Sequence, residues 1–336
     1  MKIIVDAFGG DNAPLEVLKG CRMAADELQV SVVLTGDEAA IRKCAGENGI
    51  SLDGMEIVHA SQVMDMEADP TEIRTAYRDS SMAVGMRLLA DGQGDAFVSA
   101  GSTGAFVVGA STIVRRIKGI KRAALAPIIP SAGGKFALVD CGANVECRPE
   151  MLVQFGIMGS IYMEKILGVK NPRVGLVNVG VEETKGDELR LETYRRLQLA
   201  PVNFIGNVEA RELPKNGCDV AVCDGFTGNV ILKLTEGLSS ALIGQIKGVF
   251  YKNIGTKLAA LCLKKGMMEF KKTMDYTEYG GSMLIGISKP VIKAHGSSNA
   301  KAFKNAVRQA ARIAGEGVIP EIEKALAQMK ETGGEA

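Results

Sequence analysis

The stretch DAFVSAGSTGAFVVGA, residues 95–110, passes from a strand pattern to a helix pattern through a few small residues. Its first part, Asp95–Ser99, is short and apolar, as expected of a β-strand that is buried on both faces. The small residues that follow permit a tight turn, and we expect a helix to begin near Thr103. A strand, a glycine-rich turn and a helix in this order are typical of an α/β protein.

The same arrangement recurs along the chain, where short apolar runs alternate with segments of helical spacing such as Met151–Leu167. This alternation predicts an α/β fold: a three-layer α/β/α sandwich in which a mostly parallel sheet carries helices on both faces. The expected strands are Lys2–Val5, Val30–Leu34, Met55–Val58, Asp95–Ser99, Ala123–Ile129, Lys135–Val139, Arg173–Asn178, Val202–Ile205 and Asp219–Cys223.

No repeat, low-complexity block or Pro/Ser-rich linker divides the chain. We therefore expect a single catalytic domain over residues 1–331, which includes a protruding helical excursion at 229–275. A frayed tail is expected at 332–336.

The composition is that of a folded protein, with 46% hydrophobic and 24% charged residues. The net charge is +1 and Trp is absent, so neither charge nor base stacking favours a nucleic-acid partner. The seven cysteines form no C-x-x-C pair and the N-terminus does not resemble a signal peptide, which favours reduced thiols in the cytoplasm. No apolar run reaches the ~18 residues of a membrane span. No spacing indicates a metal site, and no GxGxxG or P-loop motif indicates a nucleotide cofactor.

Glycine-rich segments follow six of the expected strands. Because ligands of open α/β sheets bind outside the carboxyl ends of the strands, these segments are the expected rim of an active site. They are VDAFGGD (5–11), LTGD (34–37), SAGSTGA (99–105), VDCGAN (139–144), NVGVEETKG (178–186) and CDGFTGN (223–229). Further rim residues are Asp6, Gly9, Gly10, Asp11, Glu183, Ser297 and Ser298.

Two of these segments are candidate sites for phosphate or a thioester oxyanion. Free backbone N–H groups at a helix start attract anions, and small side chains let them approach. The alternative for both segments is a capped helix with tight helix–sheet packing. The candidate residues are Gly101, Ser102, Thr103 and Gly104 in the first segment, and Asp224, Thr227, Gly228 and Asn229 in the second.

Four residues are candidates for the chemistry itself. Lys185 could neutralise phosphate or stabilise an oxyanion, or it could belong to a solvated surface loop. Asp140 follows an apolar run and, with Asn144, could organise the site or only cap the turn. His295 precedes a cap-like Gly-Ser-Ser string, and a lone histidine of this kind is more often structural than catalytic.

The stretch Lys252–Met274 is amphipathic and basic. Its apolar residues recur at helical spacing with lysines between them, which is typical of a membrane-surface or partner-binding helix. The alternative is a helical hairpin that packs in a dimer, and the two functions are compatible. The residues expected to contact a membrane are Leu258, Leu261, Met267 and Phe270.

Together, the motifs resemble those of one family, the phosphate:acyl-ACP acyltransferases of bacterial phospholipid synthesis (PlsX type). Two positions depart from the family pattern, since Phe8 stands where Met is usual and Ser102 where Asn is usual. Each motif alone is weak, but the ordered set is specific and runs from residue 5 to residue 298. It comprises VDAFGGDNAP, RDSSM (78–82), SAGSTGA, VDCGAN, NVGVEETKG, CDGFTGN and EYGG…VIKAHGSS (278–298).

The resemblance implies a homodimer with a fold similar to phosphotransacetylases and to isocitrate/isopropylmalate dehydrogenase-like enzymes. It implies transfer of a fatty acyl group from acyl carrier protein (ACP) to inorganic phosphate, which gives acyl phosphate for phosphatidic acid synthesis. It also implies a cytoplasmic enzyme that associates peripherally with the inner face of the membrane, where a membrane glycerol-3-phosphate acyltransferase takes the product. Because ACP is acidic, we expect it to dock on basic clusters within residues 115–122 or 257–272.

Other functions stay open. A short-chain phosphate acetyl- or butyryltransferase would use acyl-CoA and would need neither a membrane helix nor an ACP-docking surface. A decarboxylating dehydrogenase would need metal-binding aspartates and a nucleotide site, which the sequence does not indicate. A non-enzymatic membrane scaffold would leave the polar, glycine-rich strand ends without a role.

Overall fold

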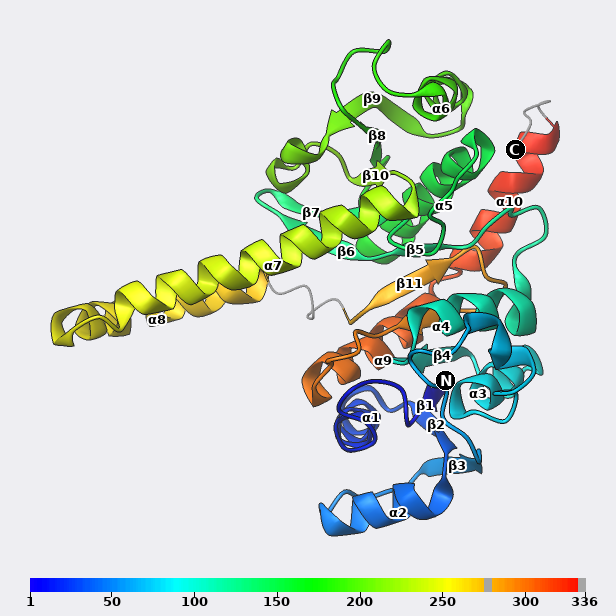
Figure 1. Ribbon diagram of the computed structural model, residues 1–336, viewed down its shortest axis with the longest axis vertical. Helices are drawn as coiled ribbons and strands as arrows, with labels where there is room; N and C mark the ends of the chain where they lie inside the picture. Colours follow the sequence, from blue (N-terminus) through cyan, green and yellow to red (C-terminus); the bar gives the residue numbers. More distant parts are fainter. Residues whose placement is uncertain (275–279, 332–336) are drawn as a thin grey trace.

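The computed structural model describes residues 1–274 and 280–331, with side chains described over 1–268 and 280–328. Its strands form two sheets (Figure 1). The first has the order β3 (Met55–His59), β2 (Ser31–Gly36), β1 (Lys2–Asp6), β4 (Ala96–Ser99), β12 (Val291–Lys293), β11 (Ser282–Ile285) and β5 (Ala124–Ala126). The second has the order β6 (Ile128–Ser131), β7 (Gly134–Val139), β10 (Val220–Val222), β8 (Arg173–Asn178) and β9 (Asn203–Glu209).

Both sheets are mostly parallel. Among the named strands of the described ranges, β11 is antiparallel to its two neighbours and β6 is antiparallel to β7. The helices are α1 (Leu15–Leu28), α2 (Glu38–Glu47), α3 (Ser81–Ala90), α4 (Thr103–Gly109), α5 (Pro149–Leu167), α6 (Glu188–Leu199), α7 (Gly225–Phe250), α8 (Ile254–Met274), α9 (Ala300–Gly315) and α10 (Val318–Glu331). Short helical turns lie at Pro70–Arg74, Ala110–Arg115 and Ala210–Lys215.

Both faces of the first sheet are covered, which explains its continuously apolar strands. In β1, Ile3 and Val5 belong to a core shared with α1 and α9, whereas Ile4 belongs to a second core shared with α3 and α4. This follows from the alternation of side chains along a strand. The predicted mostly parallel α/β sandwich is therefore confirmed, with its strands distributed over two sheets.

All nine expected strands are present, and the described ranges contain two further strands that were not expected. The missed strands, β11 and β12, have four and three residues and lie within the motif EYGG…VIKAHGSS, for which no strand was expected. Their pairing with β4 and β5 places them inside the first sheet. Strand identity here depends on partners distant in the sequence, which periodicity over a few residues cannot reveal.

The two sheets are joined where the expected strand Ala123–Ile129 divides at Pro127 into β5 and β6. The backbone N–H of Leu138 donates to the carbonyl of Pro127 at 3.1 Å, and that of Cys141 donates to Leu125, also at 3.1 Å. One extended segment therefore belongs to the first sheet through β5 and to the second sheet through β6, which pairs with β7.

A helical arm made of α7 and α8 projects from the body of the molecule (Figure 1). α7 has 26 residues and so spans roughly 39 Å. Along it, Leu234, Leu238 and Leu242 recur every fourth residue and are about half exposed or more. Across the described ranges of the chain, no helix is long and apolar enough to cross a membrane.

The first turn of α7 is fixed against the end of β7. A Cβ added at Gly228 would lie 1.9 Å from the carbonyl oxygen of Asp140, so only glycine fits without a shift of backbone. Gly237, further along the same helix, has open space around its Cα. The arm therefore packs tightly against the body at the first turn of α7, around Gly228.

These two glycines give a matched pair of substitutions. Gly228→Ala is expected to lower the free energy of unfolding by about 2–3 kcal/mol, because backbone must move to relieve the contact. Gly237→Ala is expected to leave it unchanged or raise it by up to ~1 kcal/mol through helix propensity. Denaturant unfolding of both variants measures the difference, and equal stabilities would show that α7 is not seated as described.

Candidate active site

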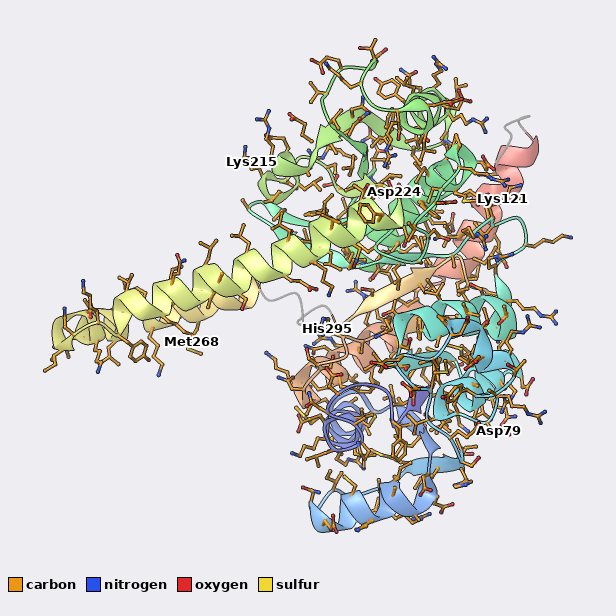
Figure 2. All side chains as sticks on the ribbon, viewed as in Figure 1. Asp79, Lys121, Lys215, Asp224, Met268 and His295 are labelled. Carbon is orange, nitrogen blue, oxygen red and sulfur yellow. The ribbon has the colours of Figure 1, made fainter. Side chains whose placement is uncertain are left out.

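A pocket of about 400 Å³ lies between the two halves of the molecule, at the carboxyl ends of parallel strands from both sheets. From the first sheet come the segments after β4 and β12, and from the second the segments after β7 and β10. Figure 2 shows His295 on the first-sheet half and Asp224 on the second-sheet half, with Met268 on the arm. Candidates that line the pocket are Gly101, Thr103, Asn229, His295 and Ser298.

A buried hydrogen-bond network shapes the first-sheet wall. The hydroxyl of Ser99 donates to Asp6 Oδ2 at 2.6 Å and accepts from the backbone N–H of Gly101 at 3.0 Å. Burial raises the pKa of Asp6, while hydrogen bonds from Ser81, Ser99 and Phe8 act in the opposite direction. The buried Asp6 therefore holds, through Ser99, the turn that follows β4.

Two glycines let the loop after β1 approach this network. A Cβ at Gly9 would lie within 2.8 Å of both Asp6 Oδ2 and Ser99 Oγ. Gly10 has a φ of +101°, which favours glycine, and a Cβ there would lie 2.8 Å from the carbonyl of Gly296. Asp11 continues the contact, since its N–H donates to that same carbonyl at 2.8 Å.

Of the candidate residues at the start of α4, some pack inside the protein and others line the pocket. Ser102 is buried and its hydroxyl makes no cap hydrogen bond to the helix. Gly104 faces Pro70, whose Cγ would lie 2.6 Å from an added Cβ. Gly104 is therefore explained by packing, whereas Gly101 and Thr103 border the pocket.

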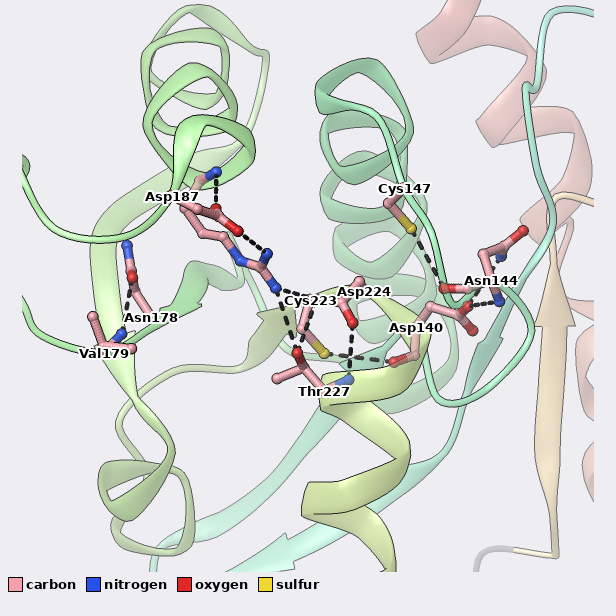
Figure 3. Close-up of polar contacts among 10 residues, drawn as sticks. Asp140, Asn144, Cys147, Asn178, Val179, Asp187, Cys223, Asp224 and Thr227 are labelled. Atoms are coloured by element: carbon pink, nitrogen blue, oxygen red, sulfur yellow. Dashed lines mark hydrogen bonds and ion pairs between the residues drawn. The ribbon is translucent and has the colours of Figure 1, made fainter.

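Asp140 and Asn144 hold the second-sheet wall together (Figure 3). The Asp140 carboxylate accepts from the backbone N–H groups of Leu125 at 2.8 Å, Ala143 at 3.3 Å and Asn144 at 2.6 Å. Asn144 Nδ2 donates to Asp140 at 3.0 Å and to the carbonyl of Ala123 at 2.7 Å. Burial raises the pKa of Asp140 to about 6, so it is mainly ionised at neutral pH. Its contacts make it a positioning residue that ties β7 to β5.

Asp224 caps α7 and pairs with Arg190 of α6 (Figure 3). It accepts from Thr227 N at 2.9 Å and from the Thr227 hydroxyl at 2.8 Å. Arg190 also reaches Asp187 at 2.8 Å. Asp224, Thr227 and Gly228 thus serve the seating of α7, and Asn229 is the member of this segment that borders the pocket.

His295 lines the pocket and lies two residues after the end of β12. Its Nδ1 lies 2.8 Å from the Ser297 hydroxyl and accepts from Ser297 N at 3.3 Å. Loss of solvation in the pocket wall, followed by the charge of Lys233, lowers the pKa of His295. The ring is therefore mainly neutral at pH 7.

The loop with Lys185 and Glu183 lies outside the pocket lining. Lys185 is exposed, and its backbone N–H and carbonyl bond within the loop, to Glu182 and Asn178. Glu183 accepts from the Tyr194 hydroxyl at 2.9 Å. In this conformation the loop matches the surface-loop alternative.

Sequence reasoning missed three charged residues in the pocket wall: Lys233, Glu236 and Lys293. Lys233 and Glu236 lie one turn apart on α7 and pair at 2.9 Å. Lys293 ends the missed strand β12 and is only 9% exposed. A lysine directly after the apolar pair Val291–Ile292 was the available signal.

Comparison with known proteins decides the family. A sequence profile described as "Fatty acid synthesis protein" matches residues 1–321. A phosphate acyltransferase of Alkaliphilus oremlandii is 47% identical over 329 residues, which cover 98% of each chain. The chain belongs to the phosphate acyltransferase family. It is an acyltransferase, and the acceptor of the acyl group is phosphate.

Solved structures agree at the level of the fold. A phosphotransacetylase from Streptococcus pyogenes superposes with a TM-score of 0.65 at 17% identity, covering 94% of each chain. A Salmonella typhimurium protein provisionally assigned as a 4-hydroxythreonine-4-phosphate dehydrogenase has a TM-score of 0.53 at 12% identity, covering 93% of this chain and 99% of its own. The expected likeness to phosphotransacetylases and dehydrogenase-like folds is confirmed.

Proposed function

We propose that this acyltransferase takes its fatty acyl group from acyl-ACP and supplies acyl phosphate for phospholipid synthesis. The observation that supports this proposal is the pocket, which combines polar groups and an apolar wall. Thr103 and Asn229 border it together with the backbone of Gly101, and the apolar wall comes from Met66, Leu125, Pro127, Ile128 and Leu232. Such a pocket suits a phosphate beside a thioester that carries an alkyl chain.

The proposed reaction needs positioning more than a strong base. A phosphate oxygen attacks the thioester carbonyl, the C–S bond breaks, and the proton of hydrogen phosphate ends on the released thiol. Thiols ionise near pH ~8.5, so the thiolate is an adequate leaving group. The enzyme contributes by holding the two reactants together and by stabilising the tetrahedral oxyanion.

The arm is the proposed place of ACP docking. The other basic cluster, Arg115–Arg122, precedes β5, whose first residue Ala124 pairs with Ile285. At the opposite end of β11, Ser282 pairs with Lys293, which lines the pocket. The cluster therefore lies toward the end of β11 that points away from the pocket. α8 carries the exposed lysines Lys257, Lys264 and Lys265 and contacts β6 on the body. The lysines on α8 are therefore the better candidates for the acidic carrier.

The arm also supports the proposed dimer and membrane contacts. The exposed leucines of α7 form a continuous apolar row that a second copy of the chain would bury. On α8, Leu258 is 59% and Leu261 is 66% exposed, whereas Met267 is half-buried. Phe270 lies in α8, but its side chain falls outside the described ones. We place the peripheral contact with the inner membrane face, where a membrane glycerol-3-phosphate acyltransferase would take the product, at Leu258 and Leu261.

The acyl donor is tested by direct comparison of palmitoyl-ACP with acetyl-CoA, each with inorganic phosphate. We expect kcat/KM for palmitoyl-ACP to be higher by at least about 10²-fold, since each buried methylene contributes ~0.8 kcal/mol and about four suffice. Mass spectrometry detects the acyl phosphate, with reactions lacking phosphate as the control. Preference for acetyl-CoA would favour the short-chain alternative, and inactivity with palmitoyl-ACP would contradict the proposed acyl donor.

The membrane contact is tested by the double substitution Leu258→Glu with Leu261→Glu. We expect it to release the protein from anionic vesicles, because two apolar side chains can no longer enter the headgroup region. Leu199→Glu, at an 89% exposed leucine off the arm, is the control and is expected to keep binding. Co-sedimentation measures binding, and an assay on soluble acyl-ACP is expected to show little change. If the double variant instead becomes monomeric or inactive, these leucines belong to a dimer interface.

A further inference from the structure

Lys293 occupies an electrostatically unusual position at the carboxyl end of β12, a central strand between β4 and β11. It is 9% exposed and lines the pocket together with Lys233 of α7. Burial of an ammonium group is unfavourable unless opposite charges or polar groups compensate for it. A buried Lys293 ammonium group therefore needs anionic or polar partners.

Charges from three elements face Lys293. Asp6 at the end of β1 and Asp11 in the following loop favour its ammonium form, and Lys233 of α7 disfavours it. Glu236, paired with Lys233, and His295 share the pocket wall. Burial, together with Lys233, lowers the pKa of Lys293 to about 8 against the opposing effect of Asp6 and Asp11. Without an anion in the pocket, the Lys293 charge is less stable than in water.

We propose that Lys293 binds the phosphate substrate directly, and that Lys233 supplies a second positive charge from α7. This inference rests on the proposed function and names the cations at its phosphate site. Lys293 Nζ donates to the carbonyl of Ala294 at 2.6 Å, which occupies one of three ammonium donors, and phosphate oxygens can accept from the others.

The surroundings suit a tetrahedral anion. β12 pairs with β4, so the turn with Gly101 and Thr103 lies beside Lys293 and borders the same pocket. Lys293 belongs to the first-sheet half, whereas α7 follows β10 of the second sheet. An anion bound by both lysines relieves their mutual repulsion and links the two halves of the site.

Phosphate binding is therefore linked to protonation of Lys293. A dianion beside the amino group favours the ammonium form, so the pKa rises from about 8 when phosphate binds. At pH 8 binding takes up a fraction of a proton, and above pH 8 the affinity falls because Lys293 loses its charge before phosphate arrives. At pH 8 free phosphate is already mainly the dianion, so it contributes little to this uptake.

The test is calorimetric titration of inorganic phosphate at pH 8 in two buffers of different ionisation enthalpy. For the wild-type protein we expect an uptake approaching about 0.5 proton per site. Lys293→Met is expected to weaken phosphate binding about 10- to 100-fold and to abolish the uptake. Lys289→Met, the same substitution in the turn at the opposite end of β12, is expected to change neither quantity.

A second variant guards against misfolding. Lys293→Arg keeps a positive charge that does not titrate near pH 8, so it is expected to bind phosphate better than Lys293→Met but without proton uptake. Thermal unfolding of each variant confirms that it is folded. Wild-type affinity and wild-type proton uptake in Lys293→Arg would overturn the inference.

Turnover separates this inference from the proposed function. If the wild-type protein forms acyl phosphate but Lys293→Met leaves the KM for phosphate unchanged, Lys293 is only a counter-charge for Asp6 and the inference is wrong. If the wild-type protein binds phosphate with proton uptake at Lys293 but forms no acyl phosphate from palmitoyl-ACP, the anion site stands and the proposed function fails.

Discussion

The hydrogen bonds around the Asp140 carboxylate determine how the two sheets meet. This buried group accepts from backbone on β5 and from the loop after β7, and Asn144 extends the contact to Ala123. Buried N–H groups are costly when unpaired, so each of these bonds favours the observed junction. The pocket exists because this junction places the carboxyl ends of strands from both sheets around one space. The contacts of Asp140 are therefore those of a residue that holds the junction of the two sheets.

The charged groups around the pocket have different roles, which follow from this geometry. The carboxylates of Asp140 and Asp224 accept hydrogen bonds from backbone N–H groups, and Asp224 also contacts the Thr227 hydroxyl and Arg190. Both carboxylates therefore stabilise the second-sheet wall of the pocket. Among the described side chains, Lys233 and Lys293 are the cations that line the pocket, and they come from opposite halves of the molecule. A nucleophile that carries its own negative charge needs such positive groups more than it needs a base. This agrees with a His295 in the pocket wall whose pKa is lowered by loss of solvation.

The sequence predicted much of this fold because the strands are buried on both faces and are therefore continuously apolar. It missed β11 and β12 because these strands are very short and are defined by distant partners. For the site, glycines near strand ends pointed to the edge of the sheets where the pocket lies, and Gly101, Thr103, Asn229 and His295 border this pocket. The roles of Asp140 and Asp224 could not be read from spacing, since they depend on which N–H groups each carboxylate meets. Lys293 was overlooked together with its strand.

The central claim is that phosphate binds in the pocket between the two sheets. A crystal structure with tungstate, a tetrahedral dianion with strong anomalous scattering, tests this directly. The account predicts one strong peak between the β4 turn and Lys293, with anion oxygens at roughly 3 Å from Lys293 Nζ and the Thr103 hydroxyl. An empty pocket, with tungstate bound instead at the exposed Lys185 loop, would contradict it.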